Sequence, residues 1–167
     1  MPTKTYYVNG FDNTYFDWIK IGTSPYLSTQ NQPTDYVYKV ARGVGKKIGD
    51  FSFPNSGAEN ANTLTDVKVY IYGKTGEDPD LGQNSITFGV HDGSSYTEFI
   101  HTPGTSWGWT SKSIFSKINT WAKLDACKIY LRTTITTADH YAYADCMYLE
   151  ATYTEAGGAT KTIGFII

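Results

Sequence analysis

The chain has 167 residues, enough for one domain with a full hydrophobic core, and 40% of them are hydrophobic while only 18% are charged. Aromatic residues reach 16%, led by 14 tyrosines, which is typical of a β-protein and argues against a helical bundle, a coiled coil or a disordered chain. The net charge of -2 provides no basic surface, so we expect no nucleic-acid partner.

Short runs rich in β-branched and aromatic residues, separated by turn residues, predict strands along the whole chain. In chain order these are residues 5–8, 15–21, 36–40, 47–53, 66–73, 85–91, 97–101, 107–111, 126–134 and 140–154. The pair Asp92-Gly93 predicts a hairpin over residues 90–97, because Asp-Gly adopts the positive φ values that such turns need.

One stretch departs from the β pattern. Ile114, Ile118 and Trp121 recur at helical spacing, with Ser111 or Ser113 as the candidate N-cap, so residues 113–124 are predicted to form one short helix between sheets. Because no βαβ alternation occurs, we predict an all-β fold, an antiparallel β-sandwich of jelly-roll type. The long C-terminal strands and the mid-chain helix favour that order over an immunoglobulin order.

The last residues differ from the rest, so we predict a sandwich domain over residues 1–154 and a flexible spacer with a terminal strand over 155–167. The apolar residues of this assembly tail are Ile163, Phe165, Ile166 and Ile167. The tail either returns as an edge strand of its own domain, or adds as a donor strand to a neighbouring subunit, or is disordered. Strand addition is attractive because an unpaired strand edge is a ready template for pairing.

The two cysteines are predicted to stay apart. Alternation places Cys127 on the apolar face of its strand and Cys146 on the opposite face of the next one, so a disulfide would need a bulge that resets the register. We therefore expect two free thiols.

No catalytic motif is recognisable. His91, His101 and His140 lack metal-binding spacing and are interpreted as surface or rim histidines, and the chain has neither a nucleophile elbow nor a phosphate-binding loop. No apolar run approaches the roughly 20 residues of a membrane-spanning helix, and no signal peptide is evident. We therefore predict a protein without enzymatic activity and without a membrane span.

An acidic turn is the candidate metal site. Glu77, Asp78 and Asp80 lie within four residues, and several carboxylates in one loop suit a hard cation such as Ca²⁺. A solvated acidic turn is the commoner structure for such a sequence, so both interpretations stay open.

The surplus of tyrosine is the most informative feature. Alternation points four tyrosines away from the core, beside lysine, arginine and glutamate: Tyr70, Tyr72, Tyr130 and Tyr148. Tyrosines flanked by charge suit a protein interface, because they bury much area at little entropic cost. Aromatic rows also stack on sugar rings, and cross-strand tyrosine pairs can simply stabilise a sheet. The tryptophans are interpreted as core residues: Trp18, Trp107, Trp109 and Trp121.

The segment 143–153 (YADCMYLEATY) resembles the last strand of galactose-binding-like and carbohydrate-binding jelly rolls, in which Asp or Asn precedes alternating apolar residues. Residues 18–38 are similar to the opening of β-sandwich modules in archaeal and phage surface proteins. The resemblance covers residues 11–154 through spacing, without a diagnostic motif. It implies a jelly roll in which Asp145 can join a structural Ca²⁺ site.

These observations predict a non-enzymatic structural subunit of an extracellular filament or tube, or of a virion. Its copies would form a homo-oligomer or polymer through sandwich packing and terminal strand addition. The alternative is a carbohydrate-binding module that holds a glycan on Tyr70, Tyr72, Tyr130 or Trp109.

Overall fold

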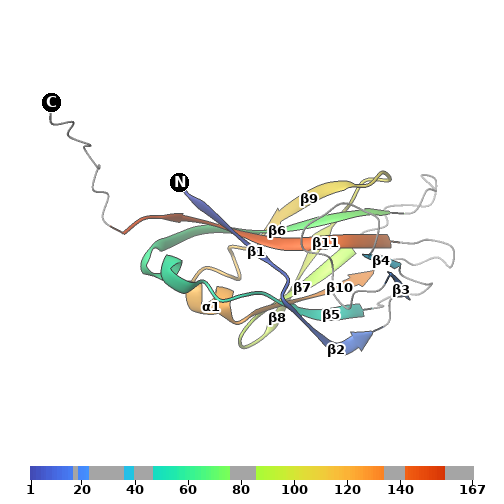
Figure 1. Cartoon of the computed structure of the whole chain (residues 1–167), viewed down its shortest axis with the longest axis horizontal. Helices are drawn as coiled ribbons and strands as arrows, with labels where there is room; N and C mark the ends of the chain where they lie inside the picture. The colour runs from blue at the N-terminus through green and yellow to red at the C-terminus, as the bar shows by residue number, and fades with distance from the viewer. Residues whose placement is uncertain (17–18, 23–35, 40–46, 76–85, 134–141, 157–167) are drawn as a thin grey trace.

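The computed structural model describes residues 1–16, 19–22, 36–39, 47–75, 86–133 and 142–156 (Figure 1). Its strands are β1 (Thr3–Tyr7), β2 (Gly10–Phe16), β3 (Ile19–Gly22), β4 (Tyr36–Lys39), β5 (Lys47–Ser52), β6 (Thr63–Thr75), β7 (Ile86–Asp92), β8 (Tyr96–His101), β9 (Gly108–Ser113), β10 (Cys127–Thr133) and β11 (Ala142–Thr154). A 3-10 helix (Gly57–Ala61) precedes β6, and α1 (Trp121–Asp125) precedes β10.

The strands form two antiparallel sheets, which Figure 1 shows as two layers. The six-stranded sheet has the order β3-β4-β11-β6-β9, with β1 also paired to β11, and the five-stranded sheet has the order β2-β5-β10-β7-β8. When β2, β3 and β4 are set aside, one sheet has the order β1-β11-β6-β9 and the other has the order β5-β10-β7-β8. These are the strand orders of a jelly roll, and every connection between these eight strands except the β7–β8 hairpin crosses from one sheet to the other. The predicted all-β, jelly-roll-like sandwich is confirmed.

Alternating residues of both sheets build the core. Val67, Val69 and Ile71 of β6 and Ile129 and Leu131 of β10 are all buried, as their period of two predicts. These inward residues fix which side of each strand is left outside. Within the described ranges, no helix has the length and hydropathy required to span a membrane.

The short helix predicted near residues 113–124 is confirmed, but it is shorter than that stretch. α1 covers only Trp121–Asp125, and its N-cap is Thr120, whose hydroxyl accepts a hydrogen bond from the N–H of Lys123 (3.3 Å). Ser111 and Ser113 instead pair with β6 as part of β9. The helical spacing of Ile114 and Ile118 reflects a single turn that buries both side chains, in which the Ile118 N–H donates to the Ile114 carbonyl (2.9 Å).

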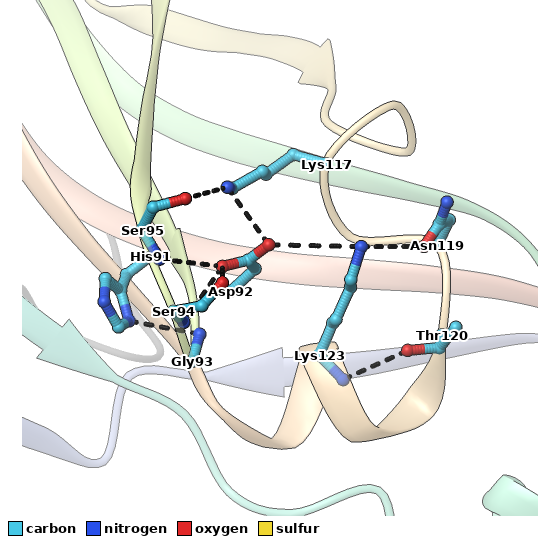
Figure 2. Close-up of polar contacts among 9 residues, drawn as sticks. All are labelled: His91, Asp92, Gly93, Ser94, Ser95, Lys117, Asn119, Thr120 and Lys123. Atoms are coloured by element: carbon cyan, nitrogen blue, oxygen red, sulfur yellow. Dashed lines mark hydrogen bonds and ion pairs between the residues drawn. The ribbon is translucent and has the colours of Figure 1, made fainter.

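The predicted β7–β8 hairpin is confirmed, and Asp92 organises it (Figure 2). Asp92 Oδ1 accepts hydrogen bonds from the N–H groups of Ser94 and Ser95, each at 3.0 Å. Its Oδ2 lies 3.0 Å from Nζ of Lys117 and 3.9 Å from Nζ of Lys123. The hydrogen bonds from the hairpin backbone, from the Ser94 hydroxyl and from Lys117 hold the pKa of Asp92 well below its usual range. The turn is thereby fastened to the segment that contains α1.

Both cysteines are free thiols, as predicted. Cys127 is a core residue of the five-stranded sheet, whereas Cys146 lies on β11 of the other sheet, opposite Tyr72 of β6. Burial raises the pKa of Cys146 to about 12. The tail residues Ile163, Phe165, Ile166 and Ile167 lie outside the described residues.

Candidate functional site

Aromatic side chains gather on the outer side of the six-stranded sheet, and we call this cluster the aromatic face. Its seven members are Tyr7, Tyr70, Tyr72, Trp107, Trp109, Tyr143 and Tyr148. The face contains Tyr70, Tyr72 and Tyr148, three of the four tyrosines that the sequence predicts to point outward.

The register of the sheet brings these rings together. Tyr148 of β11 lies opposite Tyr7 of β1 on one side and opposite Tyr70 of β6 on the other. Tyr72 lies opposite Trp109 of the edge strand β9. Since residues of one face recur at every second position, the buried Val69 and Ile71 of β6 place Tyr70 and Tyr72 outward. Tyr143 precedes Tyr148 by five residues and shares its face because the register of β11 shifts between Ala144 and Cys146. A continuous aromatic band therefore crosses four neighbouring strands.

Most rings of the aromatic face lie against each other. Tyr70 and Tyr148 stack with their centroids 4.7 Å apart and their planes 10° apart. Tyr72 and Trp107 stack at 5.5 Å and 14°. The other ring pairs of the face are tilted, and Trp109 lies at 54° to Tyr72 and at 59° to Tyr148. The stacked rings offer edges and hydroxyls to a partner, whereas Trp109 keeps 47% of its surface exposed and Tyr7 keeps 41%.

Charged groups of both signs border the aromatic face. Glu150 accepts a hydrogen bond from the Tyr70 hydroxyl (3.2 Å) and lies opposite Lys68 in the register. Nζ of Lys74 lies 5.2 Å from the centroid of the Tyr143 ring, a cation–π contact. Desolvation, followed by the neighbouring Tyr70 and Glu150, raises the pKa of Tyr148. The surface therefore combines apolar area with hydroxyls, ammonium groups and a carboxylate.

Tyr130 does not belong to this surface, which corrects the predicted set of four. Its strand β10 lies in the five-stranded sheet, so its ring is on the opposite side of the molecule, and it is only 4% exposed. The ring covers Gly89, where a Cβ atom would come within 2.1 Å of Tyr130 Cζ. Its hydroxyl donates to Glu98 Oε1 (2.6 Å), and Nζ of Lys47 lies 4.4 Å from its centroid. Tyr130 is thus a packed structural residue.

The tryptophans also need correction. Trp107 and Trp109 lie on the aromatic face and not in the core, because β9 is an edge strand whose outward residues meet Tyr72. The sequence carries a signal for this, since Ser111 and Ser113 share the alternation of the two tryptophans and indicate a solvent-facing side. Trp121 is a core residue, as predicted, and its indole N–H donates to the Asn62 carbonyl (2.6 Å). Trp18 lies outside the described residues.

One histidine is buried, contrary to the prediction of a rim position. His101 ends β8 with its ring turned inward and 6% exposed. Its Nε2 is hydrogen-bonded to the Thr110 hydroxyl, which donates to the Ile71 carbonyl (3.3 Å), so Nε2 is the donor. Burial, with a smaller effect from Lys112, lowers the pKa of His101 to about 4. His91 is half-buried at the hairpin, as a rim residue is, and His140 lies outside the described residues.

Most of the predicted Ca²⁺ site falls outside the described residues. Glu77, Asp78 and Asp80 lie outside the described residues, and Asp145 is buried at an irregularity of β11, between Ala144 and Cys146. In the part of the chain that the structure describes, no three His, Cys, Asp or Glu side chains gather as a metal site would require. Ca²⁺ binding therefore stays a prediction from the sequence.

Comparisons with known proteins add no family to this description. No model of a protein family matches the chain, and no curated protein matches it. The aromatic face is therefore the feature from which a function has to be inferred.

Proposed function

We propose that the protein is a non-enzymatic structural subunit, in an extracellular filament or tube or in a virion. Its copies pack against one another through the aromatic face and are joined by terminal strand addition. The observation that carries this proposal is the aromatic band on the outer side of the six-stranded sheet. The solvated face of a sheet normally consists of polar residues, which alternate along each strand with the apolar residues of the core. An exposed aromatic patch bordered by charges is instead typical of an interface.

The partner that fits this face best is a second copy of the chain. Lys68 and Glu150 both border the face, so two copies related by a two-fold axis can pair each lysine with the other copy's glutamate. The net charge of -2 produces little repulsion between copies. The stacked tyrosines present edges and hydroxyls, which suit contact with another protein surface.

Sedimentation of the full-length chain over a range of concentrations tests this proposal. We expect wild type to associate reversibly and Trp109→Ala to weaken the association at least about tenfold, because a central interface residue contributes more than about 1.4 kcal/mol. Trp109 is half exposed, so this truncation leaves the core intact. Lys128→Ala, at an exposed position of the other sheet, is the control and should change nothing. A wild-type chain that stays monomeric at every concentration would refute the proposal.

Carbohydrate binding is the second candidate, and Trp109 is the observation that favours it. Trp109 has an exposed indole whose plane is inclined by 54° to the ring of Tyr72 and by 59° to that of Tyr148, so a sugar ring could stack on it. A glycan array with the full-length chain, followed by calorimetry of any glycan bound, separates the two functions. A glycan that binds the monomer, and no longer binds Trp109→Ala, would replace self-packing as the role of the face.

A further inference from the structure

We infer that the outer edge of β8 accepts the C-terminal segment 160–167 of a neighbouring copy as an added β-strand. This inference rests on the proposed function, because it specifies where the terminal strand of an assembling subunit binds. It adds an acceptor that the aromatic face does not provide, since β8 belongs to the five-stranded sheet.

The first argument is the backbone of β8. Tyr96–His101 pairs with β7 without a register shift, from His91↔Tyr96 to Ile86↔His101. Within the described ranges, β7 is the one strand that pairs with β8, which makes β8 an edge strand. The strand contains neither proline nor a bulge, the features with which proteins commonly block an edge. A further strand can therefore continue the ladder.

The second argument is the side chains of β8. Ile100 lies on the outer side of the sheet and is 68% exposed, which is unusual for an aliphatic side chain on a regular strand. On the inner side, Phe99 is only partly buried and stacks on Phe88 of the core, with centroids 5.6 Å apart. Each face of the edge thus has one large apolar side chain that an added strand would cover, and the charge of Glu98 on the outer face is already paired with Arg132.

The sequence of the tail matches this edge. In an extended segment 160–167, Ile163, Phe165 and Ile167 share one side, and Ile166 lies on the other. When the segment lies beside β8, the first three extend the core next to Phe99. Ile166 then falls on the outer side, where Ile100 needs an apolar neighbour.

The neighbouring edge strand β9 is a poorer acceptor. Its residues Ser111, Lys112 and Ser113 are exposed and polar, and a lysine on an edge discourages strand pairing. The outer edge of β1 is also polar at Thr3, Lys4 and Thr5, and Lys4 is engaged in an ion pair with Glu59 (3.0 Å). Of these three edges, β8 offers the most apolar surface to the tail.

Chain reach favours a neighbouring copy over the same copy. The N–H of Ala156 is held by Asn62 Oδ1 (3.0 Å) at the end of β11. A strand beside β8 would lie about three strand spacings sideways and one sheet separation below, roughly 17 Å in all. Four fully extended residue steps from Ala156 to Thr160 cover about 14 Å. Head-to-tail addition of this kind gives a ring or an open polymer.

Disulfide trapping between two full-length chains tests the inference. One chain carries Ile100→Cys, and a tagged second chain carries Thr162→Cys, Gly164→Cys or Ile166→Cys in turn, so that the possible registers are sampled. We expect one of these mixtures to give a crosslinked heterodimer at least about tenfold above the same partners mixed with Ser111→Cys on β9. The native cysteines are buried and should not compete.

The outcomes separate this inference from the proposed function. Three outcomes would each overturn β8 as the acceptor of a neighbouring copy's tail. The first is that no crosslink forms to Ile100→Cys, and the second is that crosslinking to Ser111→Cys is equally strong. The third is that one chain with both substitutions forms the crosslink within itself at high dilution. If Trp109→Ala abolishes association while no crosslink forms, the aromatic face stands and the strand site fails. If the crosslink forms while Trp109→Ala changes nothing, the strand site stands and the role of the aromatic face fails.

Discussion

The buried histidine between the two edge strands predicts a specific loss of stability in acid. In the native state Nε2 of His101 donates to Thr110, so an added proton must enter on Nδ1, inside the protein. The ring lies beside Phe88, and the charged group that acts on it is Lys112, a cation that opposes protonation. The folded chain therefore binds this proton much less readily than the unfolded chain does.

The size of the effect follows from the two pKa values. The pKa of His101 is about 4 in the folded chain, and that of an exposed histidine is about 6.5. A depressed folded pKa means that stability is fully present above pH 6.5 and is lost as the pH falls toward 4. Between these values the free energy of unfolding should fall by about 3 kcal/mol on account of His101 alone.

The assay is urea unfolding at pH 7, 6, 5 and 4 at constant ionic strength, for wild type and His101→Gln. Glutamine keeps an N–H donor for Thr110 but does not titrate, so carboxylate protonation affects both proteins alike. We expect the free energy of unfolding of wild type, minus that of the variant, to decrease by about 3 kcal/mol from pH 7 to pH 4. If the free energies of unfolding of wild type and His101→Gln fall by the same amount over this range, the reasoning that His101 is buried in its neutral form is refuted.

Three further changes should alter stability in defined ways, each measured by urea unfolding at pH 7 and, for Asp92, also at lower pH. Gly89→Ala places a methyl group against the Tyr130 ring and should cost about 1–3 kcal/mol, part of which Tyr130→Leu should restore; no loss would contradict the close packing. Asp92→Asn removes the charge that holds Lys117, and its cost in free energy of unfolding should narrow below about pH 4, where this carboxyl begins to protonate in the unfolded chain but not in the folded one; a pH-independent cost would contradict the ion pair. Thr120→Ala removes the N-cap of α1 and should cost about 1 kcal/mol, whereas Thr120→Ser should cost less.

The local pattern of the sequence predicted strands and faces well. Val67, Val69 and Ile71 alternate with Lys68 and Tyr70, and a period of two fixes which side of a strand is buried whatever its neighbours are. Tyr70, Tyr72 and Tyr148 therefore point outward as predicted.

The pattern could not predict which strands are neighbours. Tyr130 alternates as Tyr70 does, but β10 pairs with β7 in the other sheet, and pairing between distant segments leaves no mark on local periodicity. The burial of His101 depends on the same long-range arrangement, because β9 supplies its hydrogen-bond partner. For residues 113–124, a buried turn reproduced helical spacing, and the N-cap at Thr120 is the signal that marks where α1 begins.

The position of β11 has a consequence for the order in which the protein folds. This last described strand is the central strand of its sheet, and it pairs with the N-terminal strand through contacts such as Thr3↔Thr152. Four strands of the five-stranded sheet, β5, β10, β7 and β8, are complete by Thr133, so they can associate while the ribosome is still adding residues. The other sheet must wait until β11 has been synthesised, and such distant pairings make folding slow. Until then the pairing edges of β1 and β6 that β11 joins stay open, which makes the nascent chain prone to aggregation before β11 emerges.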